Sequence, residues 1–184
     1  MRILGLSGSL RRASHNTRLL RGLTAMLPQG VELEVFDRLG EIPPFNEDDE
    51  RTAPPAVAAL KAAIAGADAV IVATPEYNAS IPGALKNALD WVSRPSTEQP
   101  LQGKPALVVG ASIGLFGAVW AQAELRKVLS TMGARVVDRE LPVAQAHETL
   151  GEDGLPQEQE AREVLESMVS ELIDLARPER LVTA

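Results

Sequence analysis

The chain contains no cysteine, few aromatic residues, only two histidines and no long apolar run. Without cysteine the protein has no disulfide framework, no thiol nucleophile and no thiolate ligand for zinc or an iron–sulfur cluster. Because this composition is compatible with a reducing compartment, we expect a cytoplasmic protein. No apolar stretch approaches the roughly 20 residues that cross a bilayer, and the first arginine pair follows the apolar start of the chain. The sequence therefore predicts neither a membrane span nor a standard signal peptide.

The chain has the composition of a single folded domain, with 184 residues, 45% hydrophobic and 23% charged. Its net charge of −7 arises late in the chain, because residues 145–184 carry ten acidic and three basic residues whereas residues 1–144 carry fifteen of each. Residues 1–31 contain five arginines and no acidic residue. This local positive charge favours a small anion, since a nucleic-acid partner calls for a broader basic face. We expect one domain over residues 1–177 and a tail over 178–184.

Short apolar strands alternate with amphipathic helices along the chain. The strand patterns lie at residues 3–6, 31–36, 69–73, 106–110 and 135–137. The helix patterns lie at residues 17–27, 55–65, 82–94, 119–132 and 158–176. Such alternation predicts a parallel sheet with helices on both faces, and right-handed crossovers limit its topology. We predict a three-layer α/β sandwich around a five-stranded parallel sheet in the order 2-1-3-4-5.

The loop after the first predicted strand is rich in hydroxyl and amide donors. It reads Gly8-Ser9-Leu10-Arg11-Arg12-Ala13-Ser14-His15-Asn16-Thr17 and leads into a predicted helix. Exposed N–H groups and the positive end of a helix favour an anion, and Arg11 adds a charge-assisted donor. The loop has neither a Walker A ending nor a GxGxxG turn, which argues against ATP and against NAD bound in the Rossmann manner. We predict a phosphate site here; the alternative for Ser14 or Asn16 alone is a plain helix N-cap.

Two further loops follow the third and fourth predicted strands. In the first, Thr74 to Gly83, two prolines bracket the only tyrosine of the chain and predict a rigid backbone. Its N–H and C=O groups could hydrogen-bond to the edge of a planar heterocycle, against which Tyr77 could pack. The second, Gly110 to Gly117, has glycines that permit close backbone approach to a ligand. The alternative is that both are ordinary strand-to-helix turns. In the predicted strand order all three loops open on one crevice at the carboxyl ends of the strands.

Two of these motifs resemble a known family. Gly8-Ser9-Leu10-Arg11 with Ser14 and Asn16, followed by the run from Pro75-Glu76-Tyr77-Asn78 to Asp90-Trp91, is similar to the NADPH-dependent FMN reductases, which include bacterial quinone, chromate and azo-dye reductases. The likeness spans about residues 1–140 and implies a flavodoxin-like fold with bound FMN. It implies a phosphate held by Ser9, Arg11, Ser14, Asn16 and Thr17. It also implies an isoalloxazine ring lined by Pro75, Glu76, Tyr77 and Asn78 and closed on its other side by residues 112–117, Ser112 and Gly114 among them.

The resemblance implies a ping-pong oxidoreductase in which NADPH or NADH reduces FMN and a quinone or similar small acceptor reoxidises it. No catalytic side chain is predicted, because the cofactor supplies the redox chemistry. No metal site is predicted either, since the acidic run 47–50 lacks the spacing of a calcium loop. The family likeness also implies a homodimer or homotetramer. Leu115, Phe116 and Trp120 are then either core residues or part of a subunit contact.

Two other functions remain open at this point. A flavodoxin-type electron carrier would bind FMN but would take its electrons from a partner protein. Such carriers flank the flavin with aromatic rings, whereas only Tyr77 and Phe116 lie in the candidate loops, which favours the reductase. A flavin-free domain on the same fold is the third possibility, because a fold does not fix a function.

Overall fold

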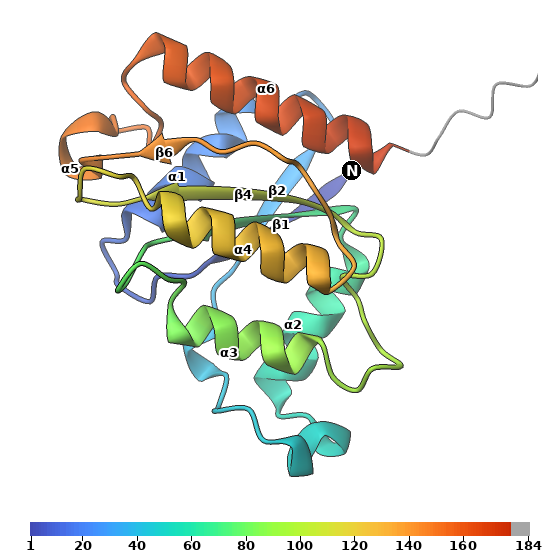
Figure 1. Ribbon diagram of the computed structural model, residues 1–184. Helices are drawn as coiled ribbons and strands as arrows, with labels where there is room; N and C mark the ends of the chain where they lie inside the picture. Colours follow the sequence, from blue (N-terminus) through green and yellow to red (C-terminus); the bar gives the residue numbers. More distant parts are fainter. Residues whose placement is uncertain (178–184) are drawn as a thin grey trace, which may run out of the picture.

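The computed structural model describes residues 1–177, so the predicted tail over 178–184 lies outside the described residues. A parallel sheet forms the middle layer, and helices cover both of its faces (Figure 1). The strands follow the path β2-β1-β3-β4-β5, and a sixth short strand, β6, also pairs with β4. The predicted three-layer fold and strand order 2-1-3-4-5 are therefore confirmed.

The elements alternate almost as the sequence predicts. The strands are β1 (Arg2–Ser7), β2 (Glu32–Phe36), β3 (Ala69–Thr74), β4 (Pro105–Ala111), β5 (Arg135–Val136) and β6 (Pro142–Val143). The α-helices are α1 (His15–Gly22), α2 (Pro55–Gly66), α3 (Gly83–Val92), α4 (Val119–Thr131), α5 (Ala146–Thr149) and α6 (Gln159–Ala176). Three short 3₁₀ helices are η1 (Leu23–Met26), η2 (Leu39–Glu41) and η3 (Glu47–Thr52). The helix predicted over 17–27 is thus α1 followed by η1.

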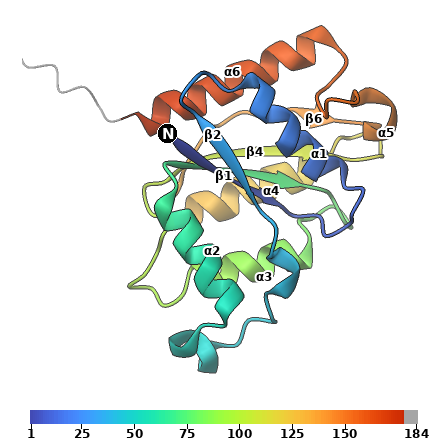
Figure 2. The ribbon, with the colours of Figure 1, turned by 180° about the vertical axis from the view of Figure 1, so that it is seen from behind.

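The two central strands carry apolar side chains on both faces because helices cover both sides of the sheet. Every residue of β3 and of β4 is buried. One core cluster packs below α2, α3 and α4 and contains Leu60, Leu85 and Leu125. The other packs below α1 and α6 and contains Leu19 and Leu172. Figure 2 shows α1 and α6 on one face and α2 and α3 on the other. Because helices pack on both faces of the sheet, the carboxyl ends of the strands, from which the candidate loops leave, are held in place.

The far edge of the sheet departs from the prediction of five strands. The start of β4 pairs with β5, and its end, Gly110 and Ala111, pairs with β6. The prediction of a single strand at 135–137 was incomplete, because a two-residue strand at Pro142–Val143 is too short to show a period in the sequence. Proline is tolerated there because an edge position does not need its N–H. As a result β6 lies beside the loop that follows β4.

None of the helices within residues 1–177 combines the length and the apolarity that a membrane crossing requires.

Candidate functional site

Three loops leave the carboxyl ends of β1, β3 and β4, and hydrogen bonds tie this region to neighbouring strands and helices. We call residues 8–14 the first loop, 75–82 the second and 112–118 the third. The Gly8 N–H donates to the carbonyl of Ala73, at the end of β3, over 2.8 Å. The Asn16 side chain bonds to the backbone of Ala111, at the end of β4. The Glu76 carboxylate accepts from the Ala121 N–H at 3.1 Å. The three loops that the strand order predicts to lie together are therefore neighbours in the structure.

The first loop presents a row of unused donors. Within residues 1–177 the backbone N–H groups of residues 10–13 donate to no acceptor. The α1 helix that follows has no acidic residue in its first turn, and Ser14 caps it by accepting from the Thr17 N–H at 3.2 Å. A Cβ at Gly8 would lie 2.9 Å from the end of the Leu85 side chain, so glycine lets the loop pass close to α3 without displacing Leu85. Free amides beside a helix start are a donor set that suits a phosphate.

The charges around the first loop favour an anion. Burial, and then the positive charges of Arg11, Arg18 and His147, lower the pKa of His15. The His15 Nδ1 atom is buried and has no hydrogen-bond partner within the described residues. Burial and the neighbouring positive charges thus both disfavour the protonated imidazole, and the same positive charges favour a negatively charged group nearby.

The five side chains assigned to the phosphate by resemblance fall into two groups. Ser9 and Arg11 are partly or fully exposed and make no ion pair within the described residues. Ser14 is occupied as the helix cap, and the Thr17 hydroxyl lies 2.8 Å from that of Ser7. Asn16 is only 2% exposed; its Nδ2 donates to the Ala111 carbonyl at 2.8 Å and its Oδ1 accepts from the Ala111 N–H at 2.9 Å. The second group thus shapes the loop, and contact with a phosphate remains a prediction for all five.

The second loop is a rigid turn. The buried Thr74 hydroxyl donates to the Pro75 carbonyl at 2.7 Å, and Tyr77 and Ser80 exchange two backbone hydrogen bonds of 3.0 and 3.2 Å. Between them Asn78 and Ala79 have φ angles of 55° and 59°, the conformation of a tight turn with two left-handed residues. Pro75 is buried beneath this turn. The loop therefore holds Tyr77 and Asn78 out toward solvent, while Glu76 points to the start of α4.

The third loop takes its shape from β6 and α5. The Ser112 N–H donates to Val143 and the Ser112 carbonyl accepts from Ala146, at 3.0 and 2.9 Å. The carbonyl of Gly114 accepts from the Gln145 N–H at 3.0 Å. The Ser112 hydroxyl accepts from the Gly114 N–H, so both predicted residues of this loop lie within one small turn.

A buried glutamine also supports the third loop, although no pattern in the sequence selects it. Gln122 lies in the first turns of α4 and donates from Nε2 to the carbonyls of Gly117 and Leu141, at 3.0 and 3.3 Å. A Cβ at Gly110 would lie 2.8 Å from its side chain, which shows how closely it packs on β4. A glutamine within an amphipathic helix resembles any solvated polar residue, so no sequence signal could have identified it.

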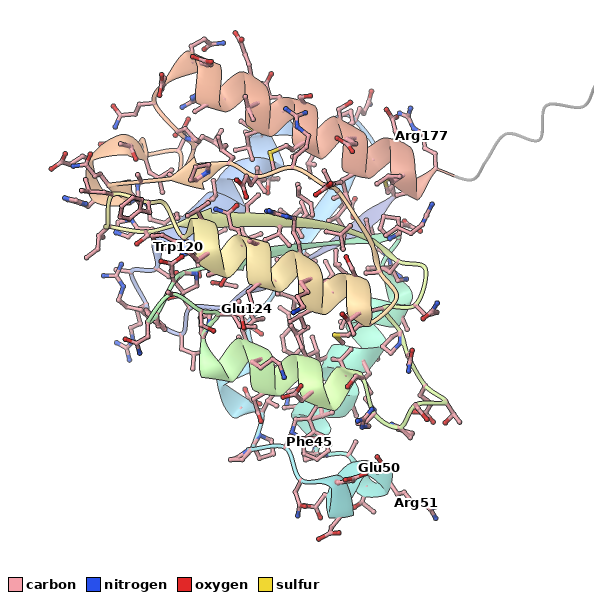
Figure 3. All side chains as sticks on the ribbon, in the orientation of Figure 1. Phe45, Glu50, Arg51, Trp120, Glu124 and Arg177 are labelled. Carbon is pink, nitrogen blue, oxygen red and sulfur yellow. The ribbon has the colours of Figure 1, made fainter. Side chains whose placement is uncertain are left out.

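Large apolar side chains of these loops, and Trp120 just after the third, face solvent. They are Leu10, Tyr77, Ile113, Leu115, Phe116 and Trp120. Leu115, Phe116 and Trp120 are 72%, 60% and 49% exposed, so the alternative that these three are core residues is wrong. The rings of Phe116 and Trp120 lie 4.9 Å apart, and Figure 3 shows Trp120 at the start of α4. Exposed apolar patches of this kind mark binding or subunit surfaces.

The site fits a ligand with one anionic and one planar apolar end. The first loop offers free amides to a phosphate, and the second and third loops offer backbone edges and apolar surface to a ring. A Cβ at Gly114 would meet only the Ser112 hydroxyl, at 3.5 Å, so the third loop leaves the space beside it open. Together with the 2-1-3-4-5 sheet, these features define a flavodoxin-like mononucleotide-binding protein.

The comparison with known proteins gives the family. Residues 1–148 match the family model described as NADPH-dependent FMN reductase, and the chain belongs to this family. It is 40% identical over 174 residues to an NAD(P)H-dependent FMN reductase of Pseudomonas aeruginosa, covering 94% of this chain and 93% of that protein. It is 39% identical over 141 residues to a quinone reductase of Escherichia coli, covering 76% and 74%.

A solved structure shows the same likeness in three dimensions. The flavoenzyme NAD(P)H:(acceptor) oxidoreductase FerB from Paracoccus denitrificans superposes with a TM-score of 0.83 and 34% sequence identity. The match covers 95% of this chain and 96% of that one. The flavodoxin-like fold and the family expected from the two motifs are therefore confirmed.

Proposed function

We propose that the protein is an FMN-dependent oxidoreductase that takes electrons from NADPH or NADH and passes them to a quinone or a similar small acceptor. The observation that carries this proposal is the first loop, with four unused N–H donors at the start of α1, beside exposed apolar surface from the other two loops. The names of the relatives support the donor and the acceptor class. They do not favour the alternative of an electron carrier.

The residues of the three loops have separate tasks in this proposal. Ser9, Arg11 and the amides of the first loop hold the phosphate, and Ser14, Asn16 and Thr17 both complete the predicted phosphate site and hold the loop in shape. The segment from Pro75 to Asn78 lines one edge of the isoalloxazine, and Ser112 and Gly114 lie on its other side. When bound, FMN accepts a hydride from the nicotinamide nucleotide and gives up electrons to the acceptor.

The protein's own contribution to the reaction is positioning. Tyr77 is the only aromatic side chain of the second loop. We expect donor and acceptor to use the site in turn, and therefore ping-pong kinetics. Glu76 is bound to the start of α4 and therefore sets the distance between the second loop and α4. No side chain is required as an acid or base. This explains a site built mainly from backbone groups.

We also propose that the protein is a homodimer or homotetramer in the cytoplasm. The exposed patch around Leu115, Phe116 and Trp120 is large and lies beside the third loop. A second copy that covers this patch would close the mouth of the site and remove apolar side chains from water. The absence of cysteine favours the cytoplasm.

The phosphate assignment can be tested by comparing FMN with riboflavin, which lacks the phosphate. The apo-protein should bind FMN far more tightly than riboflavin, measured by flavin fluorescence. Arg11→Gln combined with Ser9→Ala should weaken FMN by about 2–4 kcal/mol, because hydrogen bonds to a charged group are lost, and should leave riboflavin affinity unchanged. The exposed Arg51 makes no ion pair within the described residues, so Arg51→Gln is the matched control. Equal losses for both flavins would contradict the assignment.

A further inference from the structure

Two glutamates connect the second loop to α4, one from each side. The Glu76 carboxylate of the loop accepts from the Ala121 N–H in the first turn of α4, over 3.1 Å. The Glu124 carboxylate of α4 accepts from the Ile81 N–H near the end of the loop, over 3.3 Å. Figure 3 shows Glu124 in the first half of α4, on the side of that helix that faces α3. We call these two hydrogen bonds the glutamate clamp.

The start of α4 offers Glu76 a vacant donor. The first amides of a helix have no carbonyl partner in a preceding turn, and the residue that begins α4, Ala118, provides no side-chain cap. Glu76 therefore supplies from another loop the acceptor that a serine or an aspartate usually supplies locally. A carboxylate is favourable there also because the start of a helix has a positive electrostatic potential. The sequence of α4 thus explains why the second loop binds to it.

The clamp is the hydrogen-bonded link between the second loop and the rest of the protein. Within residues 1–177 the other hydrogen bonds of this loop are internal or run to the adjoining β3 and α3. The tip of the loop is a left-handed turn closed by the exchange between Tyr77 and Ser80. Tyr77 is exposed, and the proposed function assigns it to the ring. Apart from the packing of the buried residues beneath it, the position of this tip therefore depends on the two glutamates.

We propose that Glu124 is a positioning residue for the flavin ring, which acts by holding the second loop against α4 before the flavin binds. This inference rests on the proposed function, because the second loop is the segment assigned to the isoalloxazine. In this role Glu124 does not touch the ring; it sets where Tyr77 and Asn78 lie. A loop that is fixed in advance binds its ligand more tightly, because less conformational freedom is lost on binding.

The only tyrosine of the chain makes the position of the second loop measurable in the apo-protein. Protein labelled with fluorotyrosine gives a single fluorine NMR signal, from Tyr77. Glu124→Ala removes the acceptor of the Ile81 N–H, so the signal should move toward its position in the urea-unfolded chain. Glu76→Ala opens the other half of the clamp and should move the signal in the same direction. Glu124→Gln keeps an oxygen acceptor at the same distance from the backbone and should leave the signal at its wild-type position.

Flavin binding to the apo-protein gives a second readout that needs no turnover. Glu124→Ala should bind FMN and riboflavin about 10-fold more weakly, and both by the same factor, since the effect is at the ring and not at the phosphate. Glu124→Gln should bind both flavins as wild type does. Glu166→Ala is the matched control, because Glu166 is exposed on α6 and makes no side-chain hydrogen bond within the described residues. It should change neither the fluorine signal nor the affinity for either flavin.

Three results would overturn the inference. The first is a fluorine signal that stays at its wild-type position in both alanine variants. The second is an equal change in Glu124→Gln and Glu124→Ala, which would assign the effect to the lost charge and not to the hydrogen bond. The third is a loss of affinity for FMN alone, which would place the effect at the phosphate. If neither nicotinamide nucleotide reduces bound FMN, the proposed function itself fails, whereas the fluorine signal shows separately whether Glu124 positions the loop.

Discussion

The two hydrogen bonds between Asn16 and Ala111 connect the first turn of α1 to the end of β4, and their removal should cost stability even without a ligand. In Asn16→Ala both bonds are lost, each contributing about 1 kcal/mol net, and the buried N–H and carbonyl of Ala111 lose their side-chain partner. We expect the free energy of unfolding of the apo-protein to fall by about 2–4 kcal/mol. This is a large part of the 5–15 kcal/mol typical of a domain, yet it leaves the protein folded.

Urea unfolding of the apo-protein, followed by circular dichroism, measures this loss directly. Gln29 is exposed and makes no side-chain hydrogen bond within the described residues, so Gln29→Ala should change the free energy of unfolding by less than about 0.5 kcal/mol. If Asn16 acted only on bound FMN, Asn16→Ala would leave the apo-protein as stable as wild type and would lose stability only with FMN present. That result would refute the positioning role derived from its contacts.

Three further predictions follow from the local geometry. Ala79 is exposed at a φ of 59°, so Ala79→Gly should raise the free energy of unfolding by about 0.5–1 kcal/mol, and a lower urea midpoint would contradict the left-handed turn. Because the pKa of His15 is lowered in the folded protein, the unfolded chain takes up a proton near pH 6.5, where the folded protein does so only at lower pH. The free energy of unfolding should therefore fall as the pH drops below 6.5. His15→Gln should reduce this pH dependence in urea titrations at about pH 5 to 7. The same pH dependence of the free energy of unfolding in wild type and variant would contradict this role of His15. Trp120→Lys should convert the proposed oligomer to a smaller species in light scattering, whereas an unchanged mass would show that the exposed patch is not the contact.

The sheet was predictable because its apolar runs reflect burial directly. A strand such as β3, covered on both faces, has to be apolar throughout, and its neighbours alternate with helices that have one apolar face. The split edge was not predictable, since β5 and β6 have two residues each and draw their stability from pairing with β4. Local patterns thus determine the central strands, and tertiary contacts determine the edge.

The candidate loops were predictable in place but only partly in role. Strand ends in the order 2-1-3-4-5 bring the three loops together, whichever residues they contain. Whether Asn16 faces a ligand or the backbone of Ala111 depends on a contact across 95 positions of the sequence, which the sequence does not display. Ala118 illustrates the same limit, because its φ of 62° is a left-handed conformation that favours glycine although the residue is alanine.

The central claim, electron transfer from a nicotinamide nucleotide through FMN to a small acceptor, is tested most directly by anaerobic mixing. The FMN-loaded protein is mixed with NADPH and, separately, with NADH, and the absorbance of oxidised flavin is followed before and after addition of 1,4-benzoquinone. We predict rapid loss of the absorbance with a nicotinamide donor and its full return with the quinone. An absorbance that neither donor changes, although dithionite removes it, would contradict the claim and would favour an electron carrier.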